Sequence, residues 1–269
     1  NKKSIIIHHC EFGNAPGIFN KIIKYITYLP HYFSYLLADK IIAYTKDYAK
    51  HSMFLSKFNQ KIDYVLPPVI INEKDEKQIT KIMKRYELNN QTKVIGFVGR
   101  IGWEKGIDLL LKTIPQLKKE FDQFKIMLVG PYKEVIGDKT YYQLKKLINK
   151  YQDHVILTGR VDHKNLANYY HLFDCLVLPS TNNLETFGIV QPEAMLCQTP
   201  VIASNLPGVR VPVRKTKMGE IVEIANYKAL ANKIIKVLNN QEKYLKNYQI
   251  AKNTFSKKEF YRHWKEIIN

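Results

Sequence analysis

Residues 94–111 read VIGFVGRIGWEKGIDLLL, and this stretch decides the fold. It begins with a continuously apolar run, Val94–Gly99, which is typical of a strand buried on both faces. A glycine-containing loop with the cations Arg100 and Lys105 follows, and an apolar helical pattern begins at Ile107. A buried strand that leads through such a loop into a helix indicates an α/β unit.

The same alternation extends over nearly the whole chain of 269 residues. Short apolar runs predict strands, and helical patterns lie between them, which indicates a doubly wound α/β fold with parallel sheets and right-handed crossovers. The predicted strands are Ile5–His8, Ile41–Tyr44, Ile62–Leu66, Val94–Gly99, Ile126–Gly130, Val155–Thr158, Cys175–Pro179, Val201–Ser204 and Glu220–Glu223, and the main helical patterns are Ile107–Glu120, Tyr141–Lys150 and Asn165–Leu172.

A break in this pattern predicts two domains. Pro67-Pro68 follows the third strand, and the highly charged stretch Asn72–Glu87 precedes the fourth. Only three strands come before the break, and the chain opens on Asn1 almost directly before a strand, so we expect that an N-terminal part is missing. The predicted limits are 1–71 for a partial N-terminal domain, 72–91 for a linker, 92–250 for a complete C-terminal domain and 251–269 for a final helix.

The charge of the chain suggests an anionic partner. There are 42 Lys and Arg against 24 Asp and Glu, a net charge of +18. This balance is typical of proteins that meet nucleic acid, a membrane surface or phosphorylated ligands. Only six of the cations are Arg, the usual choice for bidentate phosphate contacts, and no nucleic-acid-binding motif is present. We therefore expect no nucleic-acid partner, and we interpret most lysines as solvated surface.

The cysteines and the hydropathy pattern indicate the compartment. Three cysteines without a CxxC spacing predict neither a disulfide framework nor a zinc site. Cys175 falls in an apolar run, which favours a buried, reduced thiol and therefore a cytoplasmic location. No apolar run is long enough to span a bilayer.

The loop 99–106 has the composition of a phosphate site. It follows the carboxyl end of a buried strand, where ligands bind in open α/β sheets. Glycine lets the backbone approach a ligand, and Arg100 and Lys105 neutralise negative charge. The spacing matches neither the dinucleotide fingerprint nor the P-loop. The alternative is a turn with two exposed cations.

A second motif, ETFGIVQPEAM at residues 185–195, follows the strand that ends near Ser180. A turn at Phe187-Gly188 and a helix over Ile189–Leu196 are predicted, with free amides at the helix start. Glu185 and Glu193 repel phosphate but accept hydrogen bonds from hydroxyls. Glu185 as a solvated loop residue and Glu193 as a structural carboxylate remain the alternatives. Both motifs follow strands of one sheet, so together they describe a site for a nucleoside-diphosphate sugar.

These residues resemble the family-four retaining glycosyltransferases of the GT-B fold, also called glycosyl transferases group 1. The similarity is strong over about 92–240 and weak over 1–70. It rests on GRIGWEKGIDLLL at 99–111, VILTGRV at 155–161, LANYYHLFDCLVLPS at 166–180 and ETFGIVQPEAMLCQTPVIAS at 185–204, including the spacing of Glu185 and Glu193. The resemblance implies two Rossmann-like domains, with the C-terminal one holding the donor.

The resemblance also implies roles for single residues. Arg100 and Lys105 match the pair that binds the diphosphate, and Glu185 matches the carboxylate that holds the donor sugar near its reacting carbon. The turn and helix start that contact the donor in this family correspond to Phe187, Gly188, Ile189 and Val190. The carboxylate that binds the ribose corresponds to Glu193. The backbone that holds the base corresponds to Arg160 and Val161. His9 matches a strand-end histidine that faces the donor sugar, with His8 as the competitor if the register differs by one.

The sequence departs from the family pattern at two places. Gln198 stands where a glycine is common, and LPGVRVPVR at 206–214 replaces a short glycine-rich turn. Arg210 and Arg214 in that segment are candidates for contacts with an anionic donor or a lipid diphosphate, or are simple loop cations. The resemblance implies a metal-independent reaction without a cofactor, with retention of anomeric configuration, and with a glycan or lipid-linked acceptor. GDP-mannose, UDP-glucose and UDP-N-acetylglucosamine all fit as donors.

The sequence leaves two other functions open, and for two segments it leaves open whether they lie on a membrane. A nucleotide-sugar epimerase of GT-B type and a non-catalytic nucleotide-sugar-binding fragment share the same motifs. The aromatic segment Phe19–Leu37, which Pro30 interrupts, and the basic segment Tyr244–Ile268 are each either a packed helix or a helix on an anionic membrane surface. The expected location is therefore cytoplasmic, with peripheral attachment to the inner face of the membrane as an option.

Overall fold

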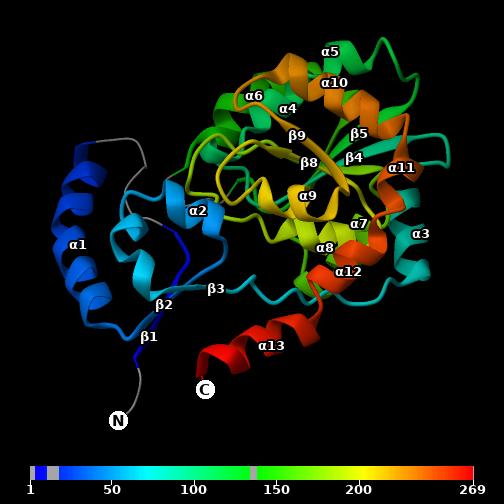
Figure 1. Ribbon diagram of the computed structural model, residues 1–269. Coiled ribbons are helices and arrows are strands. Elements are labelled where there is room, and N and C mark those ends of the chain that lie inside the picture. The colour runs from blue at the N-terminus through cyan, green and yellow to red at the C-terminus, as the bar shows by residue number, and fades with distance from the viewer. Residues whose placement is uncertain (1–3, 11–17, 134–137, 269) are drawn as a thin grey trace.

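The computed structural model describes residues 4–10, 18–133 and 138–268, and in these ranges the strands form two separate parallel sheets (Figure 1). The larger sheet has the order β6-β5-β4-β7-β8-β9 and the smaller one the order β1-β2-β3. The doubly wound α/β fold is thereby confirmed. The strands are β1 (Ile5–His8), β2 (Lys40–Ala43), β3 (Ile62–Tyr64), β4 (Lys93–Val98), β5 (Phe124–Val129), β6 (Val155–Gly159), β7 (Cys175–Leu178), β8 (Val201–Ser204) and β9 (Gly219–Val222).

Helices cover both faces of the larger sheet, which explains why its central strands are apolar without interruption. Every residue of β7 and β8 is buried. In Figure 1, α4 (Ile107–Leu111), α5 (Ile114–Leu117), α6 (Thr140–Lys150) and α10 (Tyr227–Leu238) lie above the sheet, and α7 (Leu166–Tyr170), α8 (Val190–Leu196) and α12 (Tyr248–Thr254) lie below it. Strands enclosed in this way present apolar side chains to two layers of helices.

The other helices of the chain are mostly short. They are α1 (Ile18–Leu37), α2 (Lys46–His51), α3 (Glu76–Arg85), α9 (Val211–Thr216), α11 (Gln241–Leu245) and α13 (Lys257–Ile268), with the 3₁₀ helices η1 (Leu55–Lys61), η2 (Trp103–Lys105), η3 (Gln152–His154) and η4 (His163–Asn165).

The smaller unit is built from β1, β2, β3, α1, α2 and η1. An aromatic cluster holds α1 against η1: the ring centroids of Tyr35 and Phe54 are 4.8 Å apart, and those of Tyr35 and Phe58 are 5.8 Å apart. Edge-to-face ring pairs of this kind contribute beyond the apolar area that they bury. The helix α2 begins where the Thr45 hydroxyl accepts a hydrogen bond from the Tyr48 amide at 3.1 Å.

The last helix crosses from the larger unit to the smaller one. Figure 1 shows α13, in red, leaving α12 and running below β3. Its residue Ile267 is buried with Ile42 and Val65, and Phe260 and Trp264 pack on the same cluster. This packing accounts for the apolar side of a segment that the sequence left open as packed or membrane-bound. The predicted domain limits stay predictions.

Two helical patterns differ from their predictions. The pattern Ile107–Glu120 divides into α4 and α5, because Pro115 has no amide hydrogen to bond the Leu111 carbonyl and its ring crowds that carbonyl. In α1 the opposite occurs: the helix continues through Pro30. On the two sides of Pro30, Tyr28 and Tyr35 of α1 both pack their rings on Phe54, which directly precedes η1.

Candidate functional site

The two predicted motifs lie side by side at one edge of the larger sheet. The strands β4 and β7 are parallel neighbours, with Ile95 opposite Cys175 and Gly96 opposite Leu176. Their carboxyl ends therefore meet at the same edge, and the loops that follow them, 99–106 and 179–189, run next to each other. The smaller unit faces this edge (Figure 1).

A glycine allows the two loops to touch. Gly106 has a φ of +65°, and a Cβ at this position would lie 2.1 Å from the carbonyl oxygen of Pro179. Close by, the Thr181 amide donates to the Glu104 carbonyl at 2.8 Å. Only glycine combines this backbone conformation with so close an approach. The loop that carries Lys105 is thus held directly against the loop that carries Glu185.

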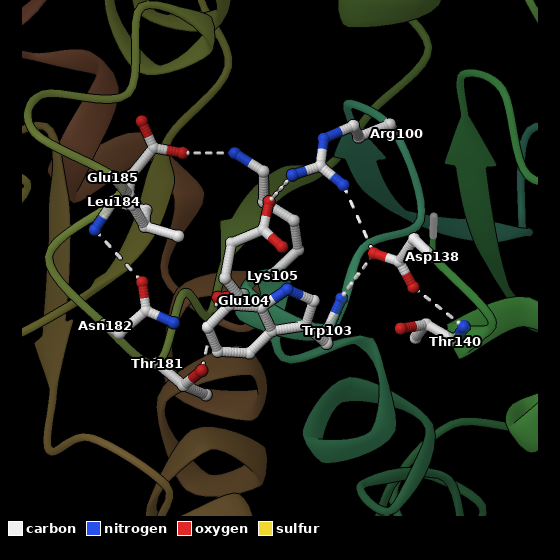
Figure 2. A network of polar contacts seen from close by, with 10 residues as sticks. All are labelled: Arg100, Trp103, Glu104, Lys105, Asp138, Thr140, Thr181, Asn182, Leu184 and Glu185. Atoms are coloured by element: carbon white, nitrogen blue, oxygen red, sulfur yellow. Dashed lines mark hydrogen bonds and ion pairs between the residues drawn. The ribbon is translucent and has the colours of Figure 1, made fainter. Parts of the chain in front are cut away.

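Lys105 and Glu185 form an ion pair at the centre of the site. The Lys105 Nζ donates to Glu185 Oε2 at 2.6 Å, and the two side chains are 20% and 15% exposed (Figure 2). The predicted diphosphate cation and the predicted sugar-binding carboxylate therefore lie together, although 80 residues separate them. A charge-assisted hydrogen bond of this length holds both head groups in defined positions.

Arg100 reaches the same part of the site from the other side. In Figure 2, the head groups of Arg100 and Lys105 both extend toward the upper middle of the view. The guanidinium pairs with the buried carboxylate of Glu104 and with Asp138, whose Oδ2 is 3.2 Å away. Asp138 also accepts from the amides of Trp103 and Thr140. Burial alone would raise the pKa of Asp138, but these hydrogen bonds and Arg100 hold it below its usual value.

The turn before α8 is built around a buried glutamine. The side-chain amide of Gln191 donates to the Phe187 carbonyl at 2.7 Å and to the Val209 carbonyl at 2.9 Å. Phe187 is buried, whereas Ile189 is exposed at the surface of the turn. The predicted turn and helix start, Phe187, Gly188, Ile189 and Val190, are thus in place beside Glu185, with α8 beginning one residue later than predicted.

Glu193 is buried and has a hydrogen-bond partner on each oxygen. The Tyr170 hydroxyl donates to Oε2 at 2.7 Å, and His163 Nε2 lies 3.1 Å from Oε1. Burial, followed by the charge of Glu193, raises the pKa of Tyr170 well above its usual value. The structural pairing that the sequence left as an alternative is therefore present. A ribose-binding role for Glu193 stays a prediction.

The two neighbouring histidines occupy different environments. His8 is buried, and its Nδ1 is hydrogen-bonded to the Tyr35 hydroxyl at 2.9 Å. His9 is exposed at the site: its carbonyl accepts from Thr186 Oγ1 at 2.8 Å, and its Nδ1 is hydrogen-bonded to the Tyr44 hydroxyl at 2.5 Å. Because Thr186 directly follows Glu185, this geometry favours His9 over His8 as the histidine that faces the donor site.

Arg160 and Val161 lie away from the Lys105–Glu185 pair. They follow the edge strand β6, which is separated from β4 by β5. Together with Lys81 and Arg85 of α3 they line a cavity of about 440 Å³. Arg160 and Val161 therefore lie at the same edge of the sheet as the Lys105–Glu185 pair, but two strands away from β4. Their role at the base site stays a prediction.

The candidate donor contact of Arg210 is replaced by a contact within the protein. Its Nη2 and Nε donate to the two oxygens of Asp47 in α2, at 2.7 and 2.8 Å. The Gly208 amide donates to the same carboxylate at 2.9 Å. Arg210 is thus not a simple loop cation, because α2 presents a carboxylate to it. Arg214, on α9, is exposed.

Five residues of the site were not identified from the sequence: Tyr44, Asp47, Asp138, Thr186 and Gln191. Each acts by holding a predicted residue or its loop, and none belongs to a spacing that indicates a site. A weak signal existed for Gln191 alone, since a polar residue inside the apolar turn of a predicted buried helix needs partners. The partners of Asp47 and Thr186 depend on the relative position of the two units. Those of Tyr44 and Asp138 depend on how segments pack within one unit.

The described ranges contain neither a cluster of metal ligands nor a helix that could span a membrane. Among residues 4–10, 18–133 and 138–268, no group of three or more His, Cys, Asp or Glu side chains is arranged to hold a metal ion. Within the part of the chain that is described, no helix combines the length and the apolar character needed to cross a bilayer.

Comparison with known proteins shows the family of the chain. The sequence profile of the family described as "Glycosyl transferases group 1" matches residues 78–254. An uncharacterized 41.2 kDa protein in the cps region of Klebsiella pneumoniae is 25% identical over 301 aligned positions, covering 99% of this chain and 79% of that protein. A phosphatidyl-myo-inositol mannosyltransferase of Mycobacterium leprae is 32% identical over 149 residues, which is 55% of this chain and 38% of the relative.

A solved structure extends the likeness to the whole fold. The Anabaena protein HepE in complex with UDP and glucose superimposes with a TM-score of 0.79 and 19% identity, covering 98% of this chain and 70% of that one. At this identity the comparison establishes the fold, and it confirms the GT-B architecture expected from the sequence.

Proposed function

This chain belongs to the group 1 glycosyl transferases, and we propose that it transfers a sugar from a nucleoside-diphosphate sugar to a glycan or lipid-linked acceptor, with retention of anomeric configuration. The observation that carries the proposal is the Lys105–Glu185 ion pair at the carboxyl ends of β4 and β7. It puts a cation suited to a diphosphate next to a carboxylate suited to sugar hydroxyls. The arrangement of the two groups matches the two halves of such a donor.

When the donor binds, Lys105 and Glu185 each give up the other and take a partner on the donor. We propose that the diphosphate accepts hydrogen bonds from Lys105 and Arg100, both of which the protein holds with carboxylates. Glu185 then accepts hydrogen bonds from hydroxyls of the donor sugar. The amides at the turn over Gly188 and Val190 add further donors for the phosphate oxygens. In the same proposal Glu193 binds the ribose and the backbone at Arg160 and Val161 binds the base.

Bond cleavage leaves negative charge on the nucleoside diphosphate. In the proposed reaction the bond between the anomeric carbon and the phosphate oxygen breaks, and the acceptor oxygen forms its bond to the same face of that carbon. The acceptor proton passes to the departing phosphate oxygen. Arg100 and Lys105 stabilise the developing charge from fixed positions, which is the work that a divalent metal performs elsewhere. Glu185 orients the sugar, and no base is assigned to it.

The acceptor side is formed by the smaller unit. A cavity of about 290 Å³ opens beside His9 and is lined mainly by apolar and aromatic side chains, among them Ile7, Tyr28, Met53 and Phe54. A cavity with these walls suits an acceptor with an apolar portion. We propose that the acceptor hydroxyl reaches the anomeric carbon next to His9. Cys175 and Cys197 are buried thiols, which supports the proposed reducing, cytoplasmic setting.

The alternative functions receive no support. Nothing in the comparisons favours a nucleotide-sugar epimerase or a binding fragment without activity.

A ligand screen by thermal unfolding tests the donor site. GDP, UDP, GDP-mannose, UDP-glucose and UDP-N-acetylglucosamine are added separately, and one nucleotide class is expected to raise the midpoint by about 5 °C near a hundredfold excess over its Kd. Lys105→Ala should remove most of that shift, while Lys112→Ala, on the exposed surface of α4, should keep it. No shift with any ligand would overturn the donor site.

The stereochemistry is tested on the product. With the identified donor and an acceptor, proton NMR of the new glycosidic bond should show the anomeric configuration of the donor. The opposite configuration would overturn retention and leave the donor site intact.

A further inference from the structure

The cavity of about 440 Å³ that Arg160 lines lies between α3 and the loop that follows β6, and we call it the α3 cavity. Figure 1 shows α3, in teal, beside α7 of the larger unit. The Asp75 amide, at the start of α3, donates to Asn168 Oδ1 of α7 at 2.7 Å, which fixes the helix as one wall of the cavity. The polar side chains on that wall, which share one face of α3 because they are spaced by three and four positions, are Gln78, Lys81 and Arg85.

The opposite wall of the α3 cavity carries a carboxylate. Asp162 lies there beside Arg160, in the loop that follows β6. Within the part of the chain that the structure describes, the Asp162 carboxylate and the head groups of Lys81 and Arg160 have no hydrogen-bond or ion-pair partner. The Arg85 guanidinium lies over the ring of Tyr86, 5.3 Å from its centroid. The cavity therefore offers an acid on one side and cations on both sides to a ligand.

The α3 cavity continues the proposed donor site beyond the ribose carboxylate. His163 directly follows Asp162, and its Nε2 lies 3.1 Å from Oε1 of Glu193. The two residues proposed to hold the base line the same cavity. A donor with its diphosphate at Lys105 and its ribose at Glu193 therefore directs its base into the α3 cavity. This step rests on the proposed function.

The charges of the cavity distinguish between the bases. Guanine presents two neighbouring donors, N1–H and the N2 amino group, which match the two oxygens of one carboxylate. Its next edge presents the acceptors O6 and N7, which match a cation. Uracil presents one donor, N3–H, between two carbonyl oxygens that a carboxylate repels, and adenine has the acceptor N1 beside its amino group. Of these three bases, guanine alone can use the acid and the cations together.

We propose that the donor is a guanosine-diphosphate sugar, and that Asp162 selects it by accepting hydrogen bonds from N1–H and the N2 amino group of the base. Lys81 and Arg85 face O6 and N7 from the wall formed by α3. Val161 and Ile82, which also line the cavity, supply apolar surface for the ring. Asp162 thereby determines specificity without touching the reacting atoms.

Titration calorimetry tests which base is bound. GDP, UDP and ADP are titrated into the chain, and GDP is expected to bind about tenfold more tightly than the other two, because it alone makes the bidentate contact. Binding of UDP or ADP as tight as that of GDP would overturn the guanine assignment and leave the proposed function standing. Binding of no nucleotide would overturn the donor site itself, and with it the proposed function.

Inosine diphosphate reports on Asp162 directly, because it lacks only the N2 amino group of GDP. The unaltered chain is expected to bind it about fivefold more weakly than GDP, for the loss of one hydrogen bond. In Asp162→Asn the two nucleotides should bind equally, GDP about tenfold more weakly than to the unaltered chain, and UDP as before. The control Asp153→Asn removes the same charge from an exposed residue of η3 and should keep the preference for GDP.

The thermal midpoint of both aspartate variants is expected to stay the same, since both residues are exposed. A preference for GDP over inosine diphosphate that persists in Asp162→Asn would overturn the role of Asp162.

The cations of α3 are tested with 7-deaza-GDP, in which a carbon atom replaces N7. The unaltered chain should prefer GDP over this analogue, and Lys81→Ala/Arg85→Ala should bind the two equally. The control Lys118→Ala/Lys119→Ala removes two exposed lysines of the larger unit and should keep the preference. The same preference in both double variants would overturn the contact between α3 and the base.

Discussion

Arg210 and Asp47 join the two units across the candidate site. The guanidinium donates to both carboxylate oxygens at 2.7 and 2.8 Å, and the two side chains are only 14% and 21% exposed. Asp47 belongs to α2 of the smaller unit, and Arg210 directly precedes α9 of the larger one. Close to this pair, Gly208 lies against Thr186, whose hydroxyl donates to the His9 carbonyl of the smaller unit. We therefore expect this bidentate pair to help hold the two units together.

Asp47→Asn should weaken the contact between the two units. It leaves the Arg210 guanidinium partly buried without a countercharge, so we expect a loss of about 1–3 kcal/mol in the free energy of unfolding and a lower transfer rate. Urea unfolding measures the loss of stability, and kcat is measured with the donor that the thermal screen identifies. Asp63→Asn, which breaks the exposed pair with Lys40, is the matched control and should change stability by less than about 1 kcal/mol. Equal effects of the two variants would contradict a specific role for Asp47.

Removal of either member of the central pair should abolish most activity. Lys105→Ala and Glu185→Ala are each expected to lower kcat/KM by about 10²-fold or more, comparable to the loss of one oxyanion-type contact. Lys105→Ala acts on charge stabilisation and should lower kcat, while Glu185→Ala should also weaken discrimination between donor sugars. Near-normal rates in both variants would refute the assignment of the donor site.

The two histidines should separate into a site residue and a structural residue. His9→Ala is expected to lower kcat by about tenfold or more with the thermal midpoint unchanged, because His9 is exposed and its proposed contact with the donor sugar is worth about one hydrogen bond. His8→Ala removes a buried partner of Tyr35 and should lower the midpoint. Tyr44→Phe keeps the ring beside Phe187 but removes the hydroxyl from His9, so it should reproduce part of the His9→Ala defect. A reversed pattern for the two alanine variants would show that the register is wrong.

Substitution of Gly106 should separate the two site loops. In Gly106→Ala the new methyl group would lie 2.1 Å from the Pro179 carbonyl, so η2 must move and Lys105 must leave Glu185. We expect loss of the nucleotide-induced thermal shift and a destabilisation of about 2 kcal/mol or more. Gly159→Ala is the control for backbone strain alone, since its φ is +75° but its nearest neighbour is 4.0 Å away. Retention of nucleotide binding in Gly106→Ala would contradict the proposed loop contact.

Glu220 should make stability depend on pH in the acid range. Burial would raise its pKa, but hydrogen bonds from Lys233, Lys236 and Tyr244 lower it from 4.5 to about 2. A lowered pKa in the folded state stabilises the fold above the unfolded value, and this stabilisation is lost as the pH falls toward 2. Glu220→Gln should therefore cost about 1–3 kcal/mol at pH 7 and progressively less between pH 4.5 and 2.

The control for this pH dependence is Glu266→Gln. Glu266 is 59% exposed and pairs with Arg262 at the surface, so its substitution should change the urea midpoint little at any pH. A constant difference between Glu220→Gln and the unaltered chain over the whole range would contradict the proposed linkage.

Much of the fold follows from local patterns. The strands differ from their predictions by one or two residues at most, because a buried parallel strand needs an apolar run and little else. The helices were less regular: Ile107–Glu120 divides at Pro115, and α1 continues through Pro30. A proline removes one backbone hydrogen bond at both places, but around Pro30 the helix is also packed on Phe54 through Tyr28 and Tyr35.

The candidate site was predicted in its residues more than in its contacts. The resemblance pointed to Arg100, Lys105 and Glu185, but no spacing along the chain shows that Lys105 meets Glu185 or that Arg100 meets Asp138. For Arg210 the sequence left an anionic ligand and a simple loop cation open, and the structure shows a pair with Asp47. The reason is that pairing across 80 or 163 residues depends on strand order and on the approach of two units.

The amino-acid sequence by itself determined the doubly wound α/β class, the place of both motifs after buried strands, and the family. These properties depend on apolar periodicity and on short stretches of residues, which need no knowledge of distant contacts. Only the tertiary structure shows that His9 is exposed beside Thr186 while His8 is buried against Tyr35, and that Asp47 pairs with Arg210. Each of these depends on which surfaces the packed units bury, and burial is a property of the assembled chain.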